Sequence, residues 1–175
     1  MYGLCRVRST AIEGLAALMH WKLHWKFFVG VNSILAHSRG ASELVKLHLM
    51  ESYCYPILSY ALECFSLSAT YIQQLNGCWN SVYRKIFDFK PWTSVRELIQ
   101  CLNRINFEHL LYQKRLCFLH NMMLCNNSVI ASVIEVFIGT NEYANICDFA
   151  CVTPSASKSN LRQSIVTKFI NSNAG

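Results

Sequence analysis

Turn-forming residues are scarce in this sequence, and their scarcity limits the possible folds more than any other feature. The 175 residues include only three prolines and seven glycines. No segment alternates apolar and polar residues long enough to predict a β-strand, whereas apolar residues recur at helical spacing through most of the chain. The sequence therefore predicts an all-α protein, an irregular bundle of about five to seven helices.

Capping residues set the expected helix boundaries. A first helix is expected over Lys22–His37. Side chains that accept hydrogen bonds from the first turn favour further helix starts at Ser42, Ser68, Asn106 and the Asn126–Ser128 turn. The helix after Ser42 should run toward Cys64, and Pro56 should kink it, because proline lacks the backbone N–H that the helix needs.

The chain divides into three expected regions. Residues 1–25 form a divergent N-terminal segment without a clear period, although Ala11–His24 could form a helix. Residues 26–138 form the main helical domain. Residues 139–175 are expected to hold a loop from Gly139 to Asn160 and a short final helix over Leu161–Ile170.

The composition is apolar for a domain of this size: 53% of the residues are hydrophobic and only 15% are charged. The apolar surface that this composition implies favours a partner protein, a neighbouring domain or a membrane. The most apolar stretch, Tyr53–Ala69, contains Pro56 and Glu63 and falls short of the roughly 20 apolar residues that cross a bilayer. We expect a buried helix there and no transmembrane segment.

Nine cysteines are scattered along the chain without a CxxC pair, and the N-terminal residues lack the pattern of a secretory leader. Reduced thiols in the core are therefore expected, together with a cytoplasmic or nuclear location. The net charge of +6 is banded. Residues 84–115 carry +4, whereas the segments on either side are acidic. A positive band favours contact with a polyanion, and a solvated helix face is the plainer alternative.

Residues for catalysis are not found in any recognisable arrangement. Asp88 and Asp148 are the only aspartates, so no adjacent pair could hold two magnesium ions. Cys117 and His120 lie one helical turn apart, but their apolar surroundings favour core packing over zinc binding. No glycine-rich phosphate loop and no nucleophile signature is present. We expect no enzyme activity, no metal and no cofactor.

A cluster of aromatic and basic residues is more informative. Trp79, Tyr83 and Phe87 recur at every fourth position and form one stripe. Aromatic rings stack on bases, but such a stripe is more often part of a core. Trp92 follows the stripe, and the best candidates for phosphate contacts lie beside it or on the later helices. These candidates are Arg84, Lys85, Lys90, Arg96, Arg104, Lys114 and Arg115.

Five short sequence segments resemble those of a known family. They are Asn32–Leu35, Glu51–Ala61, Leu75–Asn80, Tyr83–Phe87 and Ser94–Arg96. In their order and spacing they resemble the region after the catalytic core in reverse transcriptases of non-long-terminal-repeat (LINE-type) retrotransposons. The resemblance covers roughly residues 26–125.

The resemblance implies a thumb-like helical segment that grips the template–primer duplex and braces the polymerase core. Together with the banded charge it favours affinity for RNA or DNA without base specificity. The family's Tyr-x-Asp-Asp motif has no counterpart in this sequence, so polymerase activity is not expected of the chain. Two alternatives remain open. The chain could be a helical protein-interaction module that docks through apolar helix faces, or a translated relic without a selected function.

Overall fold

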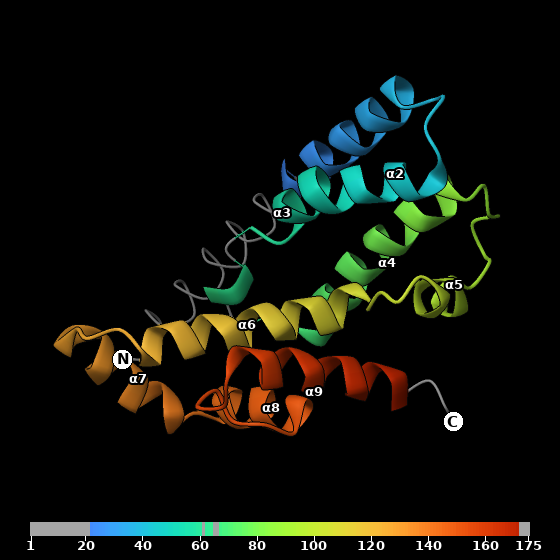
Figure 1. Ribbon diagram of the computed structural model, residues 1–175. Helices are drawn as coiled ribbons and strands as arrows, with labels where there is room; N and C mark the ends of the chain where they lie inside the picture. Colours follow the sequence, from blue (N-terminus) through green and yellow to red (C-terminus); the bar gives the residue numbers. More distant parts are fainter. Residues whose placement is uncertain (1–21, 61, 65–66, 172–175) are drawn as a thin grey trace, which may run out of the picture. The chain divides into compact units, whose positions relative to one another are not determined.

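The computed structural model describes residues 22–60, 62–64 and 67–171 (Figure 1). These residues form helices and no strand, which confirms the all-α prediction. Most of the predicted N-terminal segment, residues 1–25, and most of the possible helix Ala11–His24 lie outside the described residues. The described residues form two compact units, residues 22–60 with 86–88, and residues 62–64 and 67–85 with 89–171. Each unit is described by itself.

Two helical stretches form the described part of the first unit. Residues 22–37 are helical, and a second stretch begins with α2 (Glu43–Leu49). Ser42 caps α2 as predicted, since its side chain accepts a hydrogen bond from the Val45 N–H. The two stretches approach closely at Gly30, where an added Cβ would lie 3.4 Å from the Cys54 sulfur. Burial raises the pKa of that thiol to about 11.

Pro56 interrupts the second stretch. A π-helical turn (Met50–Cys54) separates α2 from α3 (Tyr55–Leu58), in which Pro56 lies in the first turn. Pro56 cannot donate to the carbonyl of Ser52, so one α-helical hydrogen bond is lost and a π-helical turn precedes α3. The irregular turn is the form that the predicted kink takes.

The helix after Ser42 ends earlier than predicted. It stops at Leu58, and only a short 3-10 turn (Leu62–Cys64) follows. Tyr53 and Tyr60 are 66% and 70% exposed. The prediction of a buried helix over Tyr53–Ala69 is therefore wrong, because both of these aromatic side chains face solvent. Within the described residues, no helix is long and apolar enough to span a membrane.

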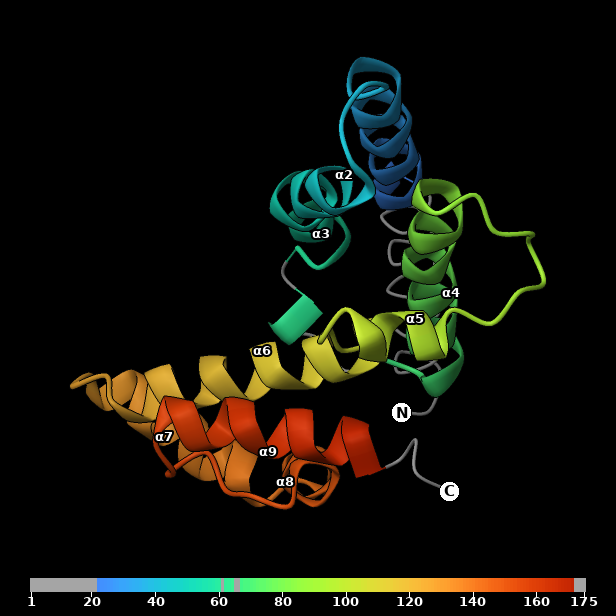
Figure 2. The ribbon, with the colours of Figure 1, turned by 45° about the vertical axis from the view of Figure 1, so that its right-hand side comes forward.

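The second unit is built around one long helix. The chain runs through α4 (Ala69–Ile86) and α5 (Arg96–Cys101) to α6 (Phe107–Met123), and then to the helices that pack on α6. Those helices are α7 (Ser128–Ile138), α8 (Asn141–Ala150) and α9 (Lys158–Asn171), which lie along α6 in both ribbon views (Figures 1 and 2).

Side chains fix the start of α4, α6 and α7 as predicted. Ser68 accepts from the Tyr71 N–H, Asn106 from the His109 N–H, and Asn127 from two N–H groups of α7. Asn76 on α4 also accepts a hydrogen bond from the Phe107 N–H at 3.2 Å. The first turn of α6 is thereby held from its own cap and from α4.

The prediction of a loop from Gly139 to Asn160 is wrong, because helix α8 lies within this range. Thr140 caps it by accepting from the Tyr143 N–H, and Ile146 and Ala150 are buried one turn apart. The sparse apolar residues of this segment conceal the helical period, yet Tyr143, Ile146 and Ala150 all recur at helical spacing. The final helix was predicted in the right place and is longer at its start.

An aromatic cluster joins α6, α8 and α9. The ring of His109, which is 6% exposed, lies 5.1 Å from both Phe149 and Phe169, and Tyr112 stacks on Phe149 at 3.7 Å. Asn106 accepts from the ring Nδ1 of His109 as well as from its backbone. Burial, then the positive charges of Lys168 and Arg96, lowers the pKa of His109 to about 4.

The cysteines differ from the expected core thiols. Of the described cysteines only Cys54 is buried, and four are exposed. The exposed ones are Cys64, Cys101, Cys125 and Cys151. The prediction failed because each exposed cysteine lies at or just beyond the end of a helix, where apolar neighbours in the sequence do not determine burial.

Cys151 ends α8 in the left-handed region, with φ 53° and ψ 32°. This conformation costs a side chain about 1 kcal/mol relative to glycine. We therefore expect Cys151→Gly to raise the free energy of unfolding by about 1 kcal/mol, measured by urea denaturation. Cys151→Ala removes the thiol but keeps the Cβ and is the control. Equal stability of the two variants would contradict the strain argument.

Acid should destabilise the second unit through His109. Its folded pKa is lowered to about 4 from 6.5, so the unfolded chain binds more protons between these values. Stability then falls as the pH drops from 6.5 toward 4. His109→Gln should reduce the loss of unfolding free energy between pH 7 and 4.5 by about 2 kcal/mol. The exposed His37→Gln controls for the substitution. Parallel pH profiles for wild type and His109→Gln would refute this coupling.

Candidate nucleic-acid interface

The predicted aromatic stripe on α4 belongs to the core. Trp79 and Tyr83 are each 1% exposed, and their rings meet edge to face with centroids 6.1 Å apart. Phe87 is half-buried. The core alternative is therefore correct for Trp79 and Tyr83, and neither ring can stack on a base.

The exposed aromatic rings lie in the connector between α4 and α5. Trp92 is 79% exposed and Phe89 is 39% exposed. The ammonium group of Lys90 lies 5.7 Å from the centre of the Trp92 ring, in cation–π range. In Figure 2 the connector loops away from the end of α4 and returns to α5. An aromatic surface and a positive charge are thus presented together on a loop.

The connector has a defined path. The Phe89 N–H donates to the carbonyl of Arg84 at 2.8 Å, and Asp88 between them has a φ of 53°. This is the left-handed helix end that asparagine and aspartate tolerate. The Arg84 Nε donates to the carbonyl of Thr93 at 2.9 Å. Arg84 therefore ties the far side of the connector to α4.

Three predicted cations are exposed around this loop: Lys85 in the last turn of α4, Lys90 in the connector and Arg96 in the first turn of α5. We call these three cations, with Phe89 and Trp92, the connector cluster. Asp88 and Glu97 are exposed in the same segment and reduce its charge. Four cations and two acids leave residues 84–97 with a net charge of +2.

The two predicted phosphate-contact residues on α6, Lys114 and Arg115, are not exposed as the prediction requires. Arg115 is 4% exposed, and its guanidinium lies 3.7 Å from a carboxylate oxygen of Glu142 on α8. The buried guanidinium is paired with a carboxylate of the neighbouring helix α8, so it cannot reach a phosphate. Lys114 and Arg104 are half-buried.

The exposed rings are Phe89 and Trp92. The sequence places Trp92 directly after the stripe, but nothing in the spacing of the stripe points to Phe89. The available signal was Pro91, which marks a loop, because aromatic rings in a short loop have less surrounding structure to bury them.

Possible metal ligands are not grouped in the part of the chain that the structure describes, where no three His, Cys, Asp or Glu side chains form a cluster. His120, which was considered with Cys117, instead donates through its Nδ1 to the carbonyl of Pro154 at 2.8 Å. It joins α6 to the segment between α8 and α9.

Comparison with protein families, curated proteins and solved structures finds no match to this chain. The chemistry of the candidate interface therefore rests on the chain's own residues.

Truncation to alanine should change the stability strongly at Trp79 and hardly at all at Trp92. Trp79→Ala removes a buried ring and should lower the free energy of unfolding by about 3 to 5 kcal/mol. Trp92→Ala removes an exposed ring and should change it by less than about 0.5 kcal/mol. Urea denaturation of both variants measures the difference. A large loss of stability in Trp92→Ala would mean that this ring is part of the core.

Proposed function

We propose that this chain is a non-catalytic, thumb-like segment of a non-long-terminal-repeat retrotransposon reverse transcriptase, and that it binds RNA or DNA without base specificity. The family resemblance over residues 26–125 and the all-α architecture support the proposal. The observation that carries it is the exposed Trp92 with the Lys90 ammonium over its ring.

The connector cluster suits a flexible or single-stranded nucleic acid. Lys85, Lys90 and Arg96 would neutralise phosphates, which supplies affinity without reading sequence. The Trp92 ring would stack on a base or sugar, and every base offers such a face. Lys90 and Trp92 lie on a loop, and Lys85 and Arg96 lie at the helix ends that flank it. No helix presents the cluster along one face, so recognition of individual base pairs is not part of the proposal.

Strand extension is not proposed for this chain. It lacks adjacent aspartates that could hold catalytic magnesium. Its role would be to hold nucleic acid and to brace a polymerase core, which would provide the chemistry. A cytoplasmic or nuclear location follows from the same proposal.

A second candidate function is protein docking through apolar surface. On α7, Val129, Val133 and Val136 are 70%, 53% and 75% exposed and recur at helical spacing. On α2, Leu44 and Val45 are at least half exposed. These faces support an interaction module, whose partner in the first proposal would be the polymerase core.

Charge reversal of the connector cluster tests the proposed function. Lys85→Glu, Lys90→Glu and Arg96→Glu together should weaken binding of a single-stranded oligonucleotide by at least about tenfold at low salt. They should also flatten the salt dependence of log K by about two units of slope. Fluorescence anisotropy across a salt series measures both effects.

The matched control reverses the same residue types at exposed positions elsewhere: Lys26→Glu, Lys158→Glu and Arg162→Glu. This control should lose much less affinity. Equal losses of affinity in the two triple variants would mean that the oligonucleotide is attracted by the overall charge and not by the connector cluster. Failure of the wild-type protein to bind at low salt would reject the proposal.

The DNA upstream of the coding sequence separates a relic from a working segment. A decayed upstream frame that carries the missing aspartates would favour the relic. An intact continuous frame would place the chain within a longer polymerase.

A further inference from the structure

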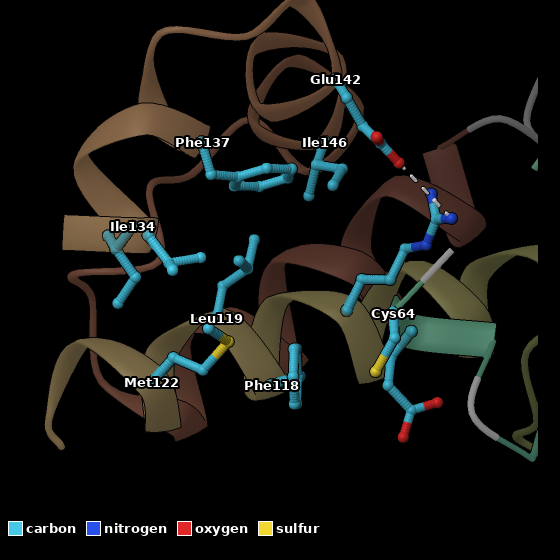
Figure 3. Close-up of a pocket in the computed structure, with 11 residues that line it drawn as sticks. Cys64, Phe118, Leu119, Met122, Ile134, Phe137, Glu142 and Ile146 are labelled. Carbon is cyan, nitrogen blue, oxygen red and sulfur yellow. Dashed lines mark ion pairs between the residues drawn. The ribbon is translucent and has the colours of Figure 1, made fainter. Parts of the chain in front are cut away.

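A partly open pocket of about 180 Å³ lies within the second unit, lined by side chains of α6, α7 and α8 beside the short turn Leu62–Cys64. Figure 3 shows the side chains that surround it. The main apolar ones are Phe118, Leu119, Met122, Ile134, Phe137 and Ile146. Three consecutive helices thus contribute a continuous apolar wall.

The charges of the cavity lie at one side. Arg115 and Glu142 approach each other to 3.7 Å there, and Glu63 also lines the pocket. In Figure 3 Glu142 lies apart from the space between Leu119, Ile134 and Phe137. An ion within that space would lose its hydration without meeting a partner. The apolar side therefore favours an uncharged occupant.

The size and shape of the wall favour one aromatic ring. An apolar cavity of about 150 Å³ lined by leucine, isoleucine and phenylalanine holds benzene. Phe118 and Phe137 offer ring edges and faces to such a ligand, and the Met122 sulfur makes favourable contacts with aromatic rings. We propose that this cavity binds a small uncharged molecule with a single aromatic ring. The site is independent of the proposed nucleic-acid function.

Toluene is the probe for this site, and the ε-methyl resonance of Met122 in a methyl NMR spectrum is the reporter. Toluene should shift this resonance saturably and should leave the methyl resonance of Met50, in the first unit, unchanged. Benzylamine and benzoate have the same ring with a charge and should bind at least about tenfold more weakly. Equal shifts from the charged compounds, or no saturable shift up to the solubility limit of toluene, would overturn the proposal.

A pair of variants on α7 locates the binding. Val133 lines the cavity but is 53% exposed, so Val133→Trp can cover the opening without entering a packed core. Val136 is 75% exposed on the same face and does not line the cavity, which makes Val136→Trp the matched control. Toluene should lose at least about tenfold in affinity for Val133→Trp and keep its affinity for Val136→Trp. Unchanged binding by Val133→Trp would place the ligand elsewhere and reject the site.

Discussion

Fixing the first turn of α6 is the constraint on which the second unit depends. Asn106 satisfies one N–H of that turn, and Asn76 reaches from α4 to satisfy that of Phe107 at 3.2 Å. A helix start has N–H groups without helical partners, and leaving them buried and unpaired would cost free energy. The two asparagines therefore set where α6 begins. Because α7, α8 and α9 all pack on α6, its register decides which of its faces each of them meets.

The consequences of that register extend along α6. Near its start His109 meets Phe149 and Phe169, and further along Arg115 meets Glu142. Both contacts require α8, which the sequence did not reveal. One missed helix thus produced two errors: a loop was predicted for residues 141–150, and Arg115 was assigned to a phosphate. The charge of Arg115 is used inside the protein because α8 brings a carboxylate to it.

Local chemistry explains which parts of the fold were predictable. Caps at Ser42, Ser68 and Asn106 act within a few residues, so sequence alone was enough to place them. Burial depends on distant partners. The spacing of Trp79 and Tyr83 shows that they share a face of α4, but it cannot show whether that face points inward. The resemblance to reverse transcriptases rests on sequence segments alone, and the function that it implies remains a prediction.

The position of the exposed surfaces within the second unit bears on how the two candidate functions relate. In both ribbon views α7 and α5 lie toward opposite ends of α6 (Figures 1 and 2). The exposed valines of α7 and the cations of the connector cluster therefore do not compete for one partner. A polymerase core could cover the apolar face of α7 while nucleic acid meets the connector cluster. Under the proposed function, docking and nucleic-acid binding are two parts of one thumb-like role, and a chain without the core would expose α7 while keeping the charges proposed to contact phosphate.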